Sequence, residues 1–199
     1  MENFNIHRYG ASILGGISIG IAGTVYLRVG GVTGACLFGF GLLAIIASGF
    51  NLFTGKAQFV WGKKGLWWLL LILAGNLIGT GLVGTLVQDN VGPAAQAILD
   101  LRVSTGWWRC MLLSVPCGFI MSAAVQAAAK GNFWVLLLGV PTFILCGFPH
   151  CIADAFYFWA APSPGDFILR CYIPIVAGNY VGCNLYRLAR WESKSITAV

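Results

Sequence analysis

The amino-acid sequence predicts an all-α membrane protein with six transmembrane helices, arranged as two inverted three-helix repeats. Of its 199 residues, 58% are hydrophobic and only 9% are charged, whereas soluble domains usually carry about a quarter charged residues. Several apolar runs approach the roughly 20 residues that a helix needs to cross a bilayer. Two short motifs also recur in the two halves of the chain.

Six apolar segments are interpreted as spans, over residues 10–29, 32–53, 66–87, 107–129, 133–161 and 167–188. The first is rich in glycine, and we expect a span with a short lead-in rather than a cleaved signal peptide, because apolar runs continue over the whole chain. The second and fifth contain polar interruptions, at residues 49–55 and 146–154. The third and fourth are separated by a long polar connection, residues 88–106, in which residues 93–101 are compatible with a short interfacial helix. The sixth leads into a short polar tail.

Tryptophans and basic residues mark the predicted ends of the spans. The tryptophans form the aromatic belt expected at membrane interfaces: Trp61, Trp67, Trp68, Trp107, Trp108, Trp134, Trp159 and Trp191. A cytoplasmic N-terminus places eight basic residues inside: Arg8, Lys56, Lys63, Lys64, Lys130, Arg187, Arg190 and Lys194. Four lie outside: Arg28, Arg102, Arg109 and Arg170. This bias predicts that both termini are cytoplasmic. Because these residues form no basic patch, the net charge of +6 does not indicate nucleic-acid binding.

Two matched motifs predict an internal repeat. The sequence AGNLIG at residues 74–79 returns as AGNYVG at 177–182, and the Gly-Phe pair at 49–50 returns at 147–148. We expect one transmembrane domain over residues 1–199, with a first repeat over 1–88, a connecting loop over 89–106 and a second repeat over 107–190. Because each repeat has three spans, the second must be inverted, which is the plan of many transporters and channels.

The interruption of the fifth span places two ionisable residues, His150 and Asp154, inside an apolar segment. Such residues within a membrane span indicate a functional site. The inverted plan brings the two interruptions together near the midplane, so we expect Thr54 to face His150. Alternatively, His150 is a neutral side chain that bonds carbonyls freed by the break, and Asp154, one turn further on, caps or orients it.

With these residues in view, the chain resembles the formate/nitrite transporter family, pentameric small-anion channels with an aquaporin-like protomer. Asn51-Leu52-Phe53-Thr54-Gly55 is similar to the family's loop in the broken second helix, and residues 147–154, GFPHCIAD, are similar to its GFEHSIAN stretch in the fifth. The Gly-Asn pairs of the third and sixth spans match as well. The resemblance covers nearly the whole chain.

The resemblance implies two groups of site residues. Those implied to line the pore or contact substrate are His150, Thr54, Leu52, Phe53, Phe38, Leu42, Phe143 and Met121. Those with an electrostatic or supporting role are Arg102, Lys56, Asp154, Asn51, Asn76 and Asn179. Apolar side chains of the first group have an alternative role in ordinary core or lipid packing, and the two last-named asparagines are expected to support helix packing.

Four positions depart from the family pattern. Pro149 replaces a glutamate, Asp154 an asparagine and Gly118 an asparagine of the fourth helix, and Lys56 stands where a small or polar residue is common. These changes alter charge and hydrogen bonding near the implied pore, so they affect the expected substrate more than the fold.

The function implied is a channel or secondary transporter for small monovalent anions or their conjugate weak acids, such as formate, nitrite, acetate, lactate or hydrosulfide. An isolated charge is costly in a low-dielectric constriction. Arg102 and Lys56 would attract the anion, and His150 would donate a hydrogen bond or a proton, which an ordinary histidine pKa of about 6.5 permits. We expect a homopentamer in a lipid bilayer, the prokaryotic cytoplasmic membrane.

Three other readings remain open. The first is a neutral-solute pore for water, ammonia or urea. The second is a thiol-sensing protein or membrane enzyme that uses Cys146 and Cys151 beside His150. The third is a scaffold that no longer conducts. We expect no enzyme, cofactor or metal site, because no nucleotide-binding loop, metal-ligand spacing or catalytic triad occurs, and the seven cysteines are interpreted as core-packing residues.

Overall fold

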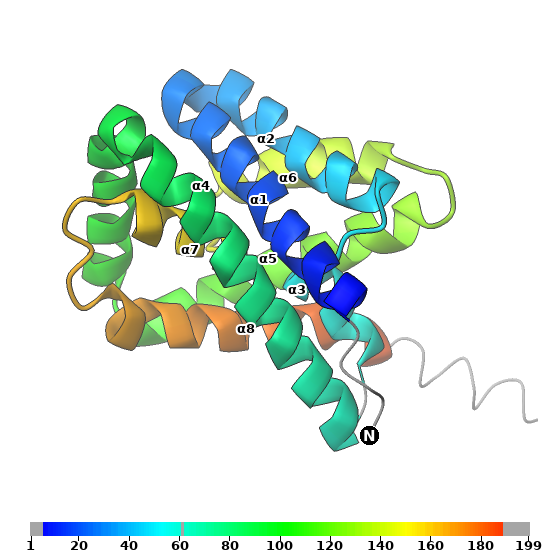
Figure 1. The fold of residues 1–199 in the computed structure, drawn as a ribbon. Helices are drawn as coiled ribbons and strands as arrows, with labels where there is room; N and C mark the ends of the chain where they lie inside the picture. The colour runs from blue at the N-terminus through cyan, green and yellow to red at the C-terminus, as the bar shows by residue number, and fades with distance from the viewer. Residues whose placement is uncertain (1–5, 61, 189–199) are drawn as a thin grey trace, which may run out of the picture.

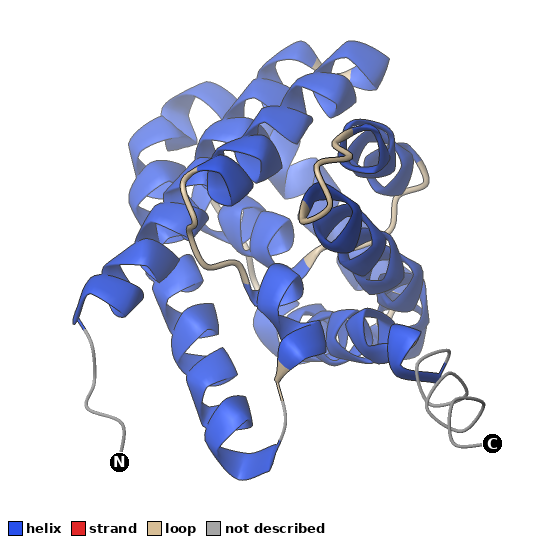
Figure 2. Cartoon of the chain, turned by 90° about the vertical axis from the view of Figure 1, so that its right-hand side faces the viewer, coloured by secondary structure: helices blue, strands red, loops and turns tan. Residues whose placement is uncertain are grey.

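A computed structural model describes residues 6–60 and 62–188, and these ranges contain helices and no strand (Figures 1 and 2). In chain order the elements are α1 (Ile6–Val29), α2 (Gly31–Ala47), α3 (Phe53–Lys56), the 3₁₀ turn η1 (Ala57–Phe59), α4 (Gly62–Thr105), α5 (Trp107–Ala128), α6 (Trp134–Leu145), α7 (Cys151–Ala160), the π-helical turn η2 (Ile168–Tyr172) and α8 (Ile173–Asn184). α1 packs on α2 and α4, and α5 packs on α6 and α8. The predicted all-α fold class is confirmed.

The second and fifth spans are broken where the sequence predicts. α2 ends before Gly49 and α6 ends before Gly147, and these glycines have φ values of 69° and 70°. The next residue in each case bonds back by five residues: Phe50 N–H to the Ile45 carbonyl and Phe148 N–H to the Phe143 carbonyl, both at 2.9 Å. This is a Schellman helix end, which places glycine in the left-handed region. A side chain there would strain the backbone.

The prediction of a connecting loop over residues 89–106 was wrong, because α4 continues through Pro93 to Thr105. Asp89 and Asn90 lie on the exposed side of this extension. Three apolar residues spaced four apart lie on its buried side: Val91, Ala95 and Leu99. This helical spacing outweighs the backbone hydrogen bond lost at an interior proline. The interfacial helix expected over residues 93–101 is part of the same extension.

The exterior of the molecule is apolar enough for a lipid environment. Three helical stretches, Tyr9–Val29, Gly62–Thr105 and Trp107–Ala128, are long and apolar enough to cross a membrane. The broken segments are shorter, so the count of six spans stays a prediction. Most of the tryptophans expected at the interfaces are exposed: Trp67, Trp107, Trp108, Trp134 and Trp159. Trp68 is half-buried, and Trp61 and Trp191 lie outside the described residues.

Several basic residues used to predict the orientation lie at helix ends. Arg28 closes α1 and Lys63 opens α4. Arg190 and Lys194 lie outside the described residues. Among the cysteines, five are buried, as expected for packing residues, whereas Cys36 and Cys146 are exposed.

Candidate functional site

The break in the second span is held by one buried asparagine from α4. The Asn76 amide donates to the carbonyl of Asn51 at 2.8 Å and to that of Ser12 on α1 at 2.6 Å. Its oxygen accepts the N–H of Phe53, the first residue of α3, at 2.9 Å. Backbone groups freed by a broken helix must find partners where water is excluded. Asn76 therefore supplies those partners and joins three segments.

The break in the fifth span is held in the same way by an asparagine of α8. The Asn179 amide donates to the carbonyls of Pro149 at 3.0 Å and Ser114 at 2.8 Å. Its oxygen accepts the N–H of Cys151, the first residue of α7, at 2.7 Å. Both asparagines were predicted to support helix packing. In the structure, each one holds a broken helix against the neighbouring long helix.

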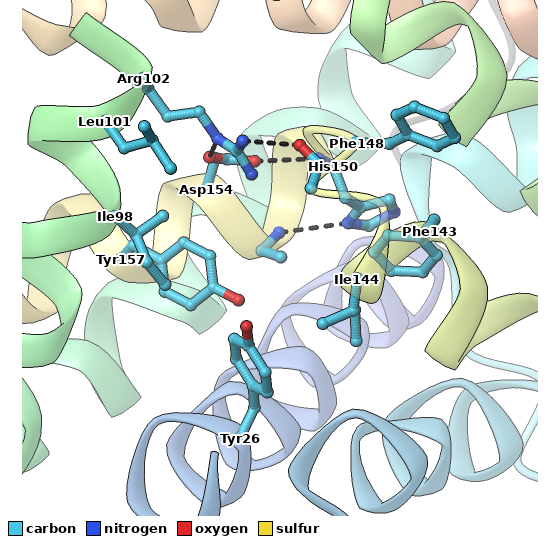
Figure 3. Close-up of a pocket in the computed structure, with 12 residues that line it drawn as sticks. Tyr26, Ile98, Leu101, Arg102, Phe143, Ile144, Phe148, His150, Asp154 and Tyr157 are labelled. Carbon is cyan, nitrogen blue, oxygen red and sulfur yellow. Dashed lines mark hydrogen bonds and ion pairs between the residues drawn. The ribbon is translucent and has the colours of Figure 1, made fainter. Parts of the chain in front are cut away.

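His150 and Thr54 lie in contact between these two breaks. Thr54 Oγ1 is 3.0 Å from His150 Nε2, and both side chains are buried. The Ala153 N–H donates to His150 Nδ1 at 3.2 Å. A dashed line to the histidine ring marks this bond in Figure 3. That nitrogen must offer a lone pair, so the proton of the neutral ring is on Nε2 and is donated to the threonine. The hydroxyl proton of Thr54 then remains available to a passing group.

Arg102 and Asp154 form a buried ion pair beside His150. Arg102 Nε donates to Asp154 Oδ1 at 2.9 Å, and Nη1 donates to the Gly147 carbonyl at 2.7 Å. The second carboxylate oxygen accepts the backbone N–H of His150 at 2.9 Å. Asp154 thus caps α7, as one alternative predicted. Arg102 was expected to attract the anion, but this carboxylate lies against it and offsets its charge (Figure 3).

Two cavities are lined by residues of the two breaks. The Arg102 cavity has a volume of about 100 Å³ and is lined by Tyr26, Ile98, Leu101, Arg102, Phe143, Ile144, Gly147, Phe148, His150, Ala153, Asp154 and Tyr157. The Lys56 cavity has a volume of about 170 Å³ and is lined by Leu42, Ile45, Ile46, Gly49, Phe50, Leu52, Gly55, Lys56, Phe59, Val125 and Ala129. Residues near the C-terminal end of α4 line the first cavity, and residues at the C-terminal end of α5 line the second.

The two cavities are built from corresponding residues. Eight positions that line the Lys56 cavity have a counterpart, 98 positions later in the sequence, that lines the Arg102 cavity. The pairs are Ile45 and Phe143, Ile46 and Ile144, Gly49 and Gly147, Phe50 and Phe148, Leu52 and His150, Gly55 and Ala153, Lys56 and Asp154, and Phe59 and Tyr157. The backbones of the two halves are therefore alike, while the polar side chains differ.

The predicted site residues divide into three groups. Four line the Arg102 cavity: His150, Phe143, Arg102 and Asp154. Three line the Lys56 cavity: Leu42, Leu52 and Lys56. The others line neither cavity: Thr54, Phe38, Phe53 and Met121, which are buried, and the three asparagines, Asn51, Asn76 and Asn179. Phe38 packs edge-on against Phe143, whose ring stacks on His150 at a centroid distance of 5.5 Å.

Gly118 faces a neighbouring helix rather than a cavity. A Cβ atom there would lie 2.9 Å from the backbone nitrogen of Cys183 and 3.0 Å from the carbonyl carbon of Asn179. Glycine at this position therefore lets α5 approach α8 closely. The expectation that this departure alters hydrogen bonding near the pore stays a prediction.

Sequence reasoning missed two tyrosines of the Arg102 cavity. Tyr157 lies three residues after Asp154, on the same face of α7, so that spacing could have revealed it. Tyr26 comes from α1 and has no such signal. Within the described residues, no group of three His, Cys, Asp or Glu side chains is arranged to hold a metal ion.

Comparison with known proteins gives a consistent result. The sequence profile of the formate/nitrite transporter family matches residues 7–191. A formate-nitrite transporter of Entamoeba histolytica is 24% identical over 87% of this chain and 60% of its own length. A formate channel of Bacillus thuringiensis is 22% identical over 76% of this chain and 68% of its own length. A solved pentameric formate channel with formate bound superposes with a TM-score of 0.83 at 22% identity, covering 96% of this chain and 97% of the other.

Proposed function

Because this chain belongs to the formate/nitrite transporter family, we propose that it conducts small monovalent anions, or their conjugate weak acids, across a membrane. The path would join the Lys56 cavity to the Arg102 cavity through the layer that contains Thr54 and His150. The observation that carries the proposal is the contact between these two side chains at 3.0 Å. This contact joins polar groups from the two breaks, and residues of each break line one of the two cavities.

The residues around that contact support selective passage. Leu42 and Leu52 line one cavity, Phe143 lines the other, and all three are buried. An apolar layer of this kind excludes water and hydrated cations. A bare anion would also be disfavoured there, so the layer needs a hydrogen-bond donor. Lys56, which has no ion pair among the described residues, would raise the local concentration of anions in its cavity.

The donor would be the hydroxyl group of Thr54. Its oxygen accepts the Nε2 proton of His150, so its own proton is free to be donated to a carboxylate or nitrite oxygen. A second proton on His150 Nδ1 would face the Ala153 N–H and break the helix cap. In this geometry the histidine acts as a neutral hydrogen-bond donor, and direct proton transfer from it would require α7 to loosen first.

Other predicted features remain proposals that the family supports. Its members are channels and transporters in membranes, so we propose that this protein is not an enzyme. The solved formate channel with formate bound is a pentamer, which supports the proposed homopentamer. We also propose a prokaryotic cytoplasmic membrane, which the bacterial relative favours and the relative from Entamoeba histolytica does not. The bias of basic residues at the span ends supports two cytoplasmic termini.

The test is flux in proteoliposomes with formate, nitrite, acetate, lactate and hydrosulfide, each at two pH values. We expect His150→Ala to lower formate flux about 10-fold or more, because the Thr54 hydroxyl would lose the contact that directs its own proton toward the anion. His7→Ala, an exposed histidine of α1, is the matched control and should retain flux. If the wild-type protein carried none of these anions but carried water or urea, the anion proposal would be wrong. Equal flux with and without His150 would contradict only the role of His150 in orienting the Thr54 donor.

A further inference from the structure

The Arg102 cavity contains two hydroxyl groups that the proposed path does not use. Tyr157, on α7, has only 4% of its surface exposed, and Tyr26, on α1, is half-buried. Both side chains line the cavity. Figure 3 shows their hydroxyl ends pointing toward one another. Within the described part of the chain, neither hydroxyl forms a hydrogen bond with another residue, so both can bind a molecule in the cavity.

The rings that carry these hydroxyls are held in place by aromatic contacts. Tyr26 packs edge-on against Phe38 at a centroid distance of 6.4 Å, and Tyr157 packs against Phe156 at 5.8 Å. Phe38 contacts Phe143, which stacks on His150. The hydroxyl groups therefore have fixed positions and are connected through packed rings to the histidine.

Arg102 adds further donors without adding net charge. It uses two N–H groups, one on Nε and one on Nη1, which leaves three of the five donors of a guanidinium. Both oxygens of Asp154 are engaged, by Arg102 and by the His150 N–H. The carboxylate therefore offsets the charge of Arg102, and each of its oxygens already accepts one hydrogen bond. What remains in the cavity is mainly hydrogen-bond donors.

The Lys56 cavity lacks this arrangement. The residue that corresponds to Tyr157 is Phe59, which has no hydroxyl group, and Lys56 takes the place of Asp154. The repeated scaffold does not require a tyrosine at this position. The donors of the Arg102 cavity are thus particular to one half of the chain.

We propose that Tyr26, Tyr157 and Arg102 form a binding subsite for a small oxyanion with two acceptor oxygens, a carboxylate or nitrite. The anion would be held there next to His150 before it enters, or after it leaves, the apolar layer. The cavity volume of about 100 Å³ is sufficient for such an anion, because a water-sized group needs only about 10–15 Å³. This inference rests on the proposed function and adds the site at which selectivity among anions is set.

The test compares Tyr26→Phe, Tyr157→Phe and the double variant with the wild-type protein. Each substitution removes one hydroxyl group and keeps the ring. The matched control is Tyr172→Phe, because the Tyr172 hydroxyl is buried without a partner and lines neither cavity. One measurement is the formate concentration that gives half-maximal flux. The other is the rise in melting temperature of the detergent-solubilised protein with added formate, since a ligand that binds the folded state stabilises it.

We expect each single variant to raise the half-saturating formate concentration about 3- to 10-fold. The two effects should not simply multiply in the double variant, because both hydroxyls contact one anion. Half-saturation by hydrosulfide, which has no pair of oxygens, should change less. Formate should stabilise the wild-type protein and the control but not the double variant, and this result would support the subsite even if formate flux were absent.

Two results would overturn the subsite. The first is equal formate half-saturation and equal thermal stabilisation in the wild-type protein and the double variant. The second is an equal change in Tyr172→Phe, which would show that the loss of any buried hydroxyl has the same effect. Absence of all anion flux with formate stabilisation intact would contradict the proposed function alone.

Discussion

Asp154 is the more deeply buried partner of its ion pair with Arg102. Its side chain is 1% exposed, whereas that of Arg102 is 11% exposed. Removing one partner of a buried ion pair leaves an uncompensated charge, which costs about 3–5 kcal/mol. The loss of stability should be larger when the charged side chain that remains is the more deeply buried of the two. The two residues of this pair are therefore not equivalent.

We predict that Arg102→Met destabilises the protein more than Asp154→Asn does. Arg102→Met leaves a carboxylate buried without its partner, and the expected loss is about 3 kcal/mol or more. Asp154→Asn keeps an oxygen for the His150 N–H and leaves a guanidinium that reaches the cavity. The measurement is thermal unfolding in detergent. The double variant should recover part of the loss, and a double variant with the summed loss of both single variants would contradict a direct interaction.

The contact between Thr54 and His150 could be predicted from the sequence, because the repeat places two interruptions in corresponding spans. The Arg102–Asp154 pair could not be predicted in the same way. The partners are 52 residues apart, and they meet because α4 continues through the residues of the expected loop to Thr105. Tyr26 was missed for a similar reason, since nothing in its neighbourhood marks the face of α1 that meets the cavity.

At the scale of elements, the two broken helices depend on the asparagines that hold them. Each asparagine makes three hydrogen bonds, two to carbonyls and one from the N–H of the first residue after the break. A buried polar backbone group without a partner costs about 1–3 kcal/mol. The breaks were predicted from glycine, proline and polar residues within apolar runs. The specific bonds of the asparagines could not be, because they link segments up to 65 residues apart.

We predict that Asn76→Ala and Asn179→Ala each lower the free energy of unfolding by about 2–5 kcal/mol, because each leaves a buried N–H and carbonyls unbonded. The measurement is the melting temperature of each variant in detergent. Asn90→Ala, an exposed asparagine of α4, is the control and should melt close to the wild-type temperature. A small effect in both buried variants would mean that the breaks hold their shape without these side chains.

The length of α4 shows where a polar pattern misleads. Gln88, Asp89 and Asn90 predicted a loop, but Gln88 donates to the Ala161 carbonyl at 2.9 Å. These three polar residues belong to one turn of the continuous helix α4, and apolar residues that follow them face the interior of the protein. Burial of the apolar residues of α4 against α7 outweighed the local preference of the three polar residues and the later proline for a loop.

At the scale of the whole molecule, the two cavities have similar backbones and different charges. The Lys56 cavity contains a lysine without an acidic partner among the described residues, whereas the Arg102 cavity contains a neutral pair. An unpaired cation concentrates anions near it, and the effect is screened by salt.

We predict that Lys56→Met lowers anion flux severalfold at low ionic strength and has a smaller effect in high salt, because screening already removes its attraction there. Proteoliposome flux at two salt concentrations measures this. The control is Lys130→Met, an exposed lysine in the turn after α5, which lines neither cavity. Equal losses in the two variants, or a loss that does not depend on salt, would rule out electrostatic attraction by Lys56.

The correspondence of cavity residues 98 positions apart has a further consequence. The matched motifs predict an inverted second repeat, in which corresponding residues would face opposite compartments. A substitution in one repeat would then change one entrance only. Lysine, leucine and phenylalanine at one entrance stand where aspartate, histidine and tyrosine stand at the other. A channel with two such different entrances is expected to behave as a rectifier, with unequal currents under opposite gradients of the same anion.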